Sequence, residues 1–204
     1  SGRSVIIPEP ELGLDEEAIP KVMAMEMYKP FVVKEMTRNL SARTPLDALL
    51  KIKKNDPSSV KALEKVFEHR PVLLKRDPGL HKFSVQAFRP KLTDGKAIKI
   101  HPLVTGGFNA DFDGDTMAMY VPVTEEAIEE SKAMMPSKNL FSPTHFGIMP
   151  TPSQDAVMGL YLATKWGKKK SFIAMKEVDV VEPMKRNMLK PSDVIKFMGK
   201  ETTA

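Results

Sequence analysis

The sequence predicts an α+β fold in which helical segments flank a compact β unit. Residues 21–69 carry apolar positions at helical spacing and two helix-start signals. Residues 71–121 hold short apolar or alternating runs separated by Gly, Pro and Asp, and helical patterns return after residue 124. With 204 residues, 42% of them hydrophobic and 28% charged, the chain has the length of one or two folded domains.

The first 70 residues are predicted to form an extended entry followed by helices. Residues 1–20 are punctuated by proline, and the apolar pattern from residue 21 to about residue 38 predicts a helix that Pro30 should end or kink. Two further helix starts, each an N-cap residue followed by proline, are Thr44-Pro45 and Asp56-Pro57, the second opening a helix to about residue 69.

The remaining elements alternate between strands and helices. Four short runs are predicted to be strands of the β unit: residues 71–74, 84–88, 97–101 and 117–121. Acidic residues in the first turn favour a helix over residues 125–135. The rest is expected to comprise a loop over 136–152, a helix over 154–165, a strand near 178–181 and a helix near 192–198.

The charge of the chain permits nucleic-acid binding without showing it, since the net charge is +5 and the pI is near 9.2. Between residues 75 and 99 the basic residues outnumber the two acidic ones, Asp77 and Asp94: they are Lys75, Arg76, Lys82, Arg89, Lys91, Lys96 and Lys99. This excess directly precedes the most acidic short motif, as a phosphate-handling site that uses a metal would need.

Composition excludes several other classes. The chain has no cysteine, so disulfides and thiolate metal sites are excluded, which suits a reducing compartment without proving one. No apolar run approaches the ~18 residues of a membrane span. Since the first residue is Ser rather than Met, we expect a piece of a longer polypeptide.

Three carboxylates stand at alternate positions between two strand-like runs: Asp111, Asp113 and Asp115. In a straight strand they would share a face but stand too far apart to touch one ion. Gly114 lets the chain turn sharply with a positive φ, so the three side chains can converge. Two unit charges at ~4 Å repel by about 4 kcal/mol at an effective dielectric near 20, so either a proton or a metal must neutralise the group. Hard oxygen ligands without nearby His or Cys favour Mg²⁺ over zinc or copper.

Two other interpretations of this segment are weighed beside the metal site. Asp-x-Asp-Gly-Asp can be a polar turn, because Asp and Gly are common hairpin residues. A calcium loop of EF-hand type fails on spacing, since counting from Asp111 puts Thr116 where Gly belongs and Pro122 where the bidentate Glu belongs. Rossmann and P-loop patterns are absent.

Residues 109–115, Asn-Ala-Asp-Phe-Asp-Gly-Asp, resemble the active-site signature of the largest (β′-type) subunit of multisubunit DNA-dependent RNA polymerases of bacterial type. Other segments are similar to the family in the family's order: residues 1–6, 28–32, 71–74, 80–81, 86–88, 95–98, 101–104, 142–143, 152–155 and 159–161. The resemblance covers roughly residues 1–166 and is weak or absent beyond. The resemblance implies that the chain is a fragment of such a subunit that contains the active site.

The resemblance implies a double-psi β-barrel that carries the catalytic loop and is flanked by helical segments. The expected divisions are an extended entry plus helical region over 1–70, the barrel over 71–123, helices and a loop flanking the active site over 124–166, and a divergent tail of strand plus helix over 167–204.

The resemblance also implies a reaction. Asp111, Asp113 and Asp115 would be catalytic and hold the tightly bound Mg²⁺ at the RNA 3′ end, and a second Mg²⁺ would arrive with the nucleoside triphosphate. Such a two-metal arrangement activates the attacking 3′-hydroxyl and stabilises the leaving pyrophosphate. The implied partners are a second large β-type subunit, the remainder of β′, the DNA template, the RNA transcript and NTPs, with no membrane. Activity would require the remaining subunits.

Four further residues have roles implied by the resemblance. Arg76 and Asn109 match the family positions that read the ribose hydroxyls of the incoming nucleotide, and their donors and acceptor suit a 2′-OH. The alternative for Arg76 is a surface ion pair with Asp77. Gln154 matches a residue near the same ribose, and its alternative is the plain second residue of a helix. Arg3 matches a position near the nucleic acid, and its alternative is an exposed side chain.

The departures from the family pattern lie beside these residues. Residues 75–79, Lys-Arg-Asp-Pro-Gly, replace the usual Asn-Arg-Ala-Pro-Thr, and Thr116 replaces a Gln. Asp77 can pull the Arg76 guanidinium aside or orient it, which bears on ribose discrimination. The departures and the unfamiliar tail favour a divergent lineage, for which a large bacteriophage with its own multisubunit polymerase is the leading hypothesis.

Two histidines of the β unit, His81 and His101, are expected to be structural hydrogen-bonding groups rather than catalysts. The competing function for the whole chain is a degenerate, non-catalytic polymerase-like interaction module. The presence of Asn109 and Arg76 beside all three aspartates disfavours that module.

Overall fold

The computed structural model describes residues 1–142, 147–152, 155–165, 167–191 and 193–203. The chain divides into two compact units, residues 1–151 and residues 152–204. No helix within the described ranges is long and apolar enough to cross a lipid bilayer.

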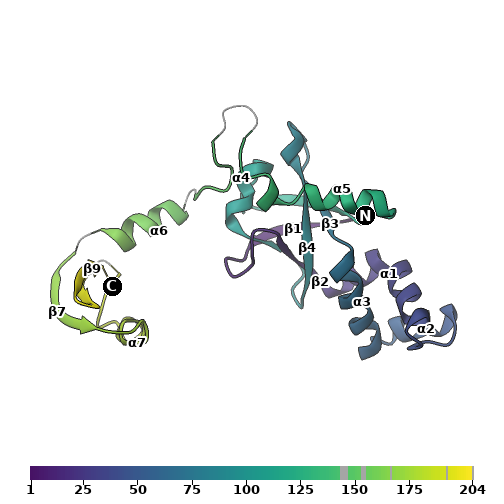
Figure 1. Cartoon of the computed structure of the whole chain (residues 1–204), viewed down its shortest axis with the longest axis horizontal. Coiled ribbons are helices and arrows are strands. Elements are labelled where there is room, and N and C mark those ends of the chain that lie inside the picture. The colour runs from purple at the N-terminus through teal and green to yellow at the C-terminus, as the bar shows by residue number, and fades with distance from the viewer. Residues whose placement is uncertain (143–146, 153–154, 166, 192, 204) are drawn as a thin grey trace. The chain divides into compact units, whose positions relative to one another are not determined.

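The first unit is built around a closed six-stranded barrel (Figure 1). Its strands are β1 (Gly2–Pro8), β2 (Glu16–Pro20), β3 (Val72–Lys75), β4 (Val85–Thr93), β5 (Ile98–Ile100) and β6 (Thr116–Tyr120), in the spatial order β1-β5-β2-β4-β3-β6. The pairs β1–β5 and β2–β4 are parallel, and the other four are antiparallel. Closure leaves no free sheet edge. The barrel and its helices confirm the α+β class and the double-psi barrel.

The barrel begins earlier in the chain than the sequence predicts. The expected barrel was residues 71–123, yet β1 and β2 come from the first 20 residues, which were assigned to an extended entry. These strands pair with partners far along the chain, for example Ile6 with Ile98 and Glu16 with Arg89. Local patterns carry no record of such long-range pairing.

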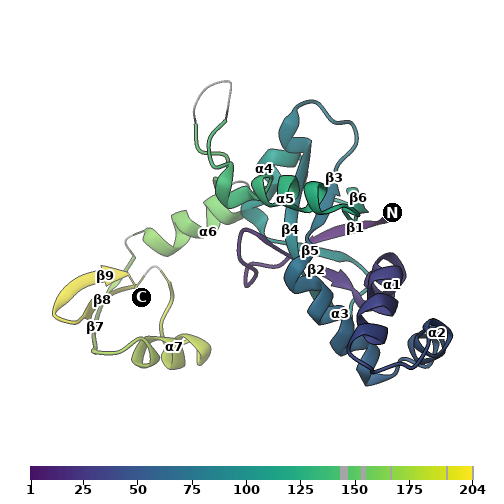
Figure 2. The same cartoon turned by 45° about the vertical axis from the view of Figure 1, so that its right-hand side comes forward.

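Three helices lie together beside the barrel (Figures 1 and 2): α1 (Lys21–Arg38), α2 (Pro45–Lys53) and α3 (Pro57–His69). The predicted caps are confirmed, because the Thr44 side chain accepts the Asp47 N–H at 3.1 Å and the Asp56 carboxylate accepts the Ser58 N–H at 2.8 Å. Pro30 does not end α1. It lies on the exposed face, where water can satisfy the carbonyl that its missing N–H leaves free.

The core joins these helices to the barrel. Its largest fully buried side chains are Tyr28, Phe88, Phe108, Ile6, Ile19, Met36, Leu63, Leu74, Ile98, Ile100, Met117 and Met119. Phe88 of β4 stacks on Phe108 with 6.2 Å between ring centroids. Val22, an apolar residue in the first turn of α1, is 85% exposed. The core therefore reaches from α1 across β4 to the residue just before the acidic loop.

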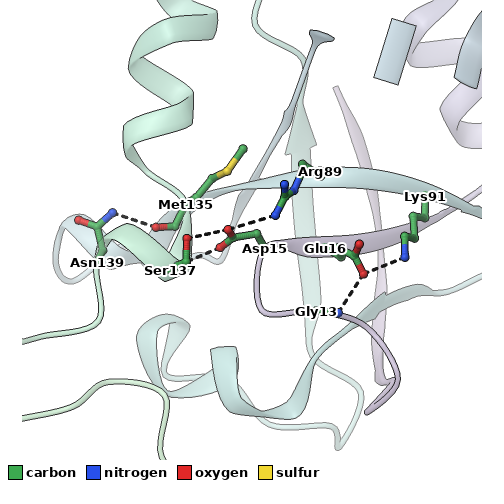
Figure 3. Close-up of polar contacts among 8 residues, drawn as sticks. All are labelled: Gly13, Asp15, Glu16, Arg89, Lys91, Met135, Ser137 and Asn139. Carbon is green, nitrogen blue, oxygen red and sulfur yellow. Dashed lines mark hydrogen bonds and ion pairs between the residues drawn. The ribbon is translucent and has the colours of Figure 1, made fainter. Parts of the chain in front are cut away.

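A polar clasp fixes the segment that follows α5 (Glu125–Ala133) onto the barrel (Figure 3). Asp15, in the turn before β2, accepts the Ser137 N–H at 2.8 Å and the Ser137 hydroxyl at 2.6 Å. The oxygen that accepts the Ser137 hydroxyl, Asp15 Oδ2, also forms an ion pair with Arg89 of β4 at 3.4 Å. Ser137 belongs to the short helix η3 (Pro136–Lys138). Three distant segments thus meet at one buried carboxylate.

The second unit contains α6 (Asp155–Thr164), α7 (Val178–Lys185) and a three-stranded sheet of β7 (Lys169–Ala174), β8 (Val194–Phe197) and β9 (Lys200–Thr203), with β8 in the centre. The strand expected near 178–181 is wrong, because this segment is helical. The Asp179 carboxylate accepts the N–H groups of Met175 and Lys176, which closes a turn there. The helix expected near 192–198 is also wrong, since β8 pairs with strands on both sides.

Candidate metal centre

The acidic loop joins the short helix α4 (Thr105–Phe108) to β6. Asn109 caps α4 in the left-handed conformation, with φ 50° and ψ 46°, and its N–H donates to Gly106 O at 3.3 Å. Gly114 has φ 119°, the positive value that the sequence predicts for this position. A side chain at Gly114 would be strained by the backbone itself. Two left-handed turns therefore bend residues 109–115 into a tight loop.

The bend brings the three carboxylates together. One oxygen from each of Asp111, Asp113 and Asp115 lies within 4.8 Å of the other two. Within the described residues this is the one group of three or more acidic or histidine side chains arranged so that they can hold a metal ion. The predicted convergence is confirmed.

The electrostatics of the cluster are asymmetric. The pKa of Asp111 is raised, first by a hydrogen bond with Asp113, then by desolvation and by the charges of Asp113 and Asp115. The pKa of Asp115 is lowered, first because the Arg76 side chain donates a hydrogen bond to it. The neighbouring carboxylates thus disfavour the anion of Asp111 while Arg76 stabilises that of Asp115, and a bound cation would relieve the repulsion.

The donor set fits Mg²⁺. All three side chains offer hard oxygen atoms, the ligands that Mg²⁺ prefers, and these oxygens lie within 4.8 Å of one another, close enough to face one ion. Asp113 is exposed, so the water molecules that Mg²⁺ usually retains can reach the site.

Arg76 faces the loop from the end of β3. β3 ends at Lys75 and β6 begins one residue after Asp115, and the two strands pair with Lys75 opposite Ala118. The Arg76 Nε donates to Asp115 Oδ2 at 2.8 Å, and both side chains are about one fifth exposed. The ion pair joins residues 39 positions apart, and sequence reasoning missed it because no local signal connects them.

Asp77 forms ion pairs with residues other than Arg76. Its carboxylate pairs with Arg3 at 3.0 Å and with Lys75 at 2.8 Å. The alternative of a surface pair between Arg76 and Asp77 is therefore not what the structure has. Arg3 on β1 and Lys75 on β3 both lie opposite Ala118 of β6. The strand β6, which follows the acidic loop, therefore runs between these two residues.

The other candidates are placed as follows. Asn109 is exposed at the start of the acidic loop. Gln154 lies outside the described residues. His81 Nδ1 accepts the Phe83 N–H and His101 Nδ1 accepts the Leu103 N–H, so each caps a single helical turn, η1 (Lys82–Ser84) or η2 (Pro102–Val104). Both histidines have the structural role that was predicted.

Comparison with known proteins identifies the context of this loop. The family model described as RNA polymerase Rpb1, domain 2, matches residues 43–137, which include the whole acidic loop. A DNA-directed RNA polymerase subunit beta′ from Chlorobaculum parvum is 44% identical over 206 aligned residues, 98% of this chain. The corresponding subunit from Chlorobium luteolum is 49% identical over 81% of the chain, and that from Mesoplasma florum is 47% identical over 80%. The chain belongs to the RNA polymerase β′ family.

The β′ relatives are much longer than this chain, which spans 14% of the Chlorobaculum parvum subunit and 11% of the Chlorobium luteolum subunit. The alignment to the Chlorobaculum parvum subunit covers 98% of the chain, so some similarity extends past residue 166, whereas the alignments to the Chlorobium luteolum and Mesoplasma florum subunits cover 81% and 80%, as expected if similarity is weak in the tail. These β′ relatives are bacterial, and the bacteriophage origin stays a prediction.

Proposed function

We propose that this chain forms the Mg²⁺-binding part of the active centre of a DNA-directed RNA polymerase, a nucleotidyltransferase that adds ribonucleotides to the RNA 3′ end. The observation that carries the proposal is the convergence of Asp111, Asp113 and Asp115 within 4.8 Å on a barrel loop, in a chain 44–49% identical to named β′ subunits. A degenerate module that kept only the fold would not need to retain this cluster of like charges, which is unfavourable without a cation.

The three aspartates would hold the tightly bound Mg²⁺ and share some of their oxygens with a second Mg²⁺ carried in by the triphosphate. Bound there, the two ions would activate the 3′-hydroxyl and neutralise charge on the pyrophosphate. The protein supplies no nucleophile: its residues bind and orient. Gly114 and Asn109 shape the loop, and Arg76 holds Asp115 in place.

The residues that would select the nucleotide are proposed to lie beside the three aspartates. Arg76 has guanidinium N–H groups besides the Nε–H that it donates to Asp115, and these can donate to a ribose hydroxyl. The exposed Asn109 amide can both donate and accept. The role of Gln154 near the ribose is carried over from the family resemblance alone, since this residue lies outside the described residues. Arg3, exposed and paired with Asp77, is proposed to contact nucleic acid.

The proposed partners follow from membership of the β′ family and from the greater length of the relatives. The remainder of β′, a second large β-type subunit, the DNA template, the RNA transcript and NTPs would complete the active complex. The chain alone is expected to be inactive in transcription.

The test is Mg²⁺-dependent primer extension by the complex assembled with the remaining subunits. Asp113→Ala should lower the extension rate by roughly 100-fold or more, because a ligand to ions that contribute several kcal/mol of transition-state stabilisation is lost. Asp94→Ala, which removes an exposed carboxylate from the loop between β4 and β5, is the matched control and should extend normally. Normal extension by Asp113→Ala would end the catalytic interpretation and favour the interaction module.

A further inference from the structure

Among the described residues, the hydrogen bonds to the carboxylate of Asp115 all reach the same oxygen. Oδ2 accepts the Arg76 Nε–H at 2.8 Å and the Asp111 backbone N–H at 3.3 Å. Both hydrogen bonds that the described residues donate to this carboxylate therefore fall on Oδ2, which leaves Oδ1 as the oxygen available to an ion.

Arg76 is anchored through its backbone, and most of its side chain is buried. Its backbone N–H donates to Ser84 O at 3.1 Å, and its side chain is only 20% exposed. The anion next to it in the sequence, Asp77, pairs instead with Arg3 and Lys75. The Nε–H of a guanidinium is fixed in the guanidinium plane, so its hydrogen bond restricts the rotation of the partner carboxylate more than a lysine ammonium would.

We propose that Arg76 is a positioning residue that keeps Asp115 a one-oxygen ligand and so biases the centre towards Mg²⁺ over Ca²⁺. The inference rests on the proposed function. Mg²⁺ demands near-octahedral geometry at about 2.0–2.1 Å, whereas Ca²⁺ takes roughly 6–8 oxygens at about 2.3–2.6 Å and readily accepts a bidentate carboxylate. Because Oδ2 already accepts two hydrogen bonds, Asp115 can offer both oxygens to Ca²⁺ only by weakening one of them, and the charge-assisted bond from Arg76 is the shorter of the two.

The ratio of the two affinities isolates this geometric effect. Mg²⁺ and Ca²⁺ carry the same charge, so the repulsion between either ion and the Arg76 cation largely cancels when the two affinities are compared. General loosening of the loop would likewise lower both affinities together. A change in the Mg²⁺ to Ca²⁺ affinity ratio therefore reports on the ligand geometry.

The experiment measures Mn²⁺ binding to the chain by electron paramagnetic resonance and displaces it with Mg²⁺ or Ca²⁺. Arg76→Ala should shift the affinity ratio roughly tenfold towards Ca²⁺, the size of effect expected for a residue that orients a metal ligand. Arg76→Lys keeps the charge without the planar N–H group and should shift the ratio in the same direction. Asp77→Ala, the matched control, should leave the ratio within twofold of the wild-type value.

The outcomes separate the two proposals. A wild-type ratio in both Arg76 variants, with circular dichroism showing a folded chain, would overturn the positioning role and leave the proposed function standing. Mn²⁺ binding that Asp113→Ala does not weaken would instead count against the metal centre itself.

Discussion

Glu17 is a carboxylic acid sealed inside the protein, and replacing it with Gln should change how stability depends on pH. The side chain lies on β2 between Pro90 of β4 and Ile100 of β5 and is 0% exposed. Neither of its carboxylate oxygens has a hydrogen-bond partner within the described residues. Burial raises its pKa from 4.5 to about 8.

The size of the effect on stability follows from the difference between the pKa of Glu17 in the folded and in the unfolded protein. A carboxyl whose folded pKa lies above its unfolded pKa stabilises the fold fully below the unfolded value, and this contribution is lost as pH rises to the folded value. Here the window runs from pH 4.5 to about pH 8. About 3.5 pH units at about 1.4 kcal/mol per unit give an upper value of about 5 kcal/mol.

The assay is urea unfolding followed by circular dichroism, at intervals from pH 5 to pH 8.5. Because the side-chain amide of the Glu17→Gln variant cannot ionise, the variant's free energy of unfolding should rise relative to wild type by up to about 1.4 kcal/mol for each pH unit until about pH 8. Glu16→Gln is the control: the Glu16 carboxylate pairs with Lys91 and its pKa is lowered, so it is ionised in both states and the difference should be flat above pH 6. A flat difference for Glu17→Gln as well would refute the reasoning.

Three other predictions concern the site and its support. Arg76→Ala should reduce the preference of the assembled polymerase for ribonucleotides over deoxyribonucleotides, measured by competitive incorporation; an unchanged preference would reject the ribose role. Asp15→Ala should lower the free energy of unfolding by roughly 2–3 kcal/mol because two hydrogen bonds from Ser137 to a buried carboxylate are lost, and it should be strongly non-additive with Ser137→Ala in a double-mutant cycle; additivity would contradict the clasp. Thr44→Ala should lower the free energy of unfolding by about 1 kcal/mol in the same urea assay, because the α2 cap is lost. An unchanged free energy of unfolding would mean that the cap contributes nothing to stability.

The helix starts and the bend of the acidic loop could be predicted from the sequence, because each depends on residues within one turn of the chain. A cap residue followed by proline marks the start of α2 and of α3, because the side chain and the proline ring both act within one turn. Gly114 marks the bend of the acidic loop for the same kind of reason. The convergence of the aspartates could therefore be predicted from residues 109–115 alone.

Features that depend on distant contacts could not be predicted in this way. β1 and β2 are strands because β4, β5 and β6 accept them, and nothing within residues 1–20 specifies those partners. The helix α7 and strand β8 were predicted with their types exchanged, since short apolar runs fit either structure until a turn or a pairing partner decides. The pairing of Arg76 with Asp115 rather than with its neighbour Asp77 depends equally on strand register.

The most direct test of the metal centre is anomalous diffraction from crystals of the chain soaked in Mn²⁺. One strong peak should appear roughly 2.1–2.2 Å from oxygens of Asp111, Asp113 and Asp115, since Mn²⁺ substitutes for Mg²⁺ at oxygen sites. Carboxylates that point apart into solvent, with no peak among them at saturating Mn²⁺, would contradict the account.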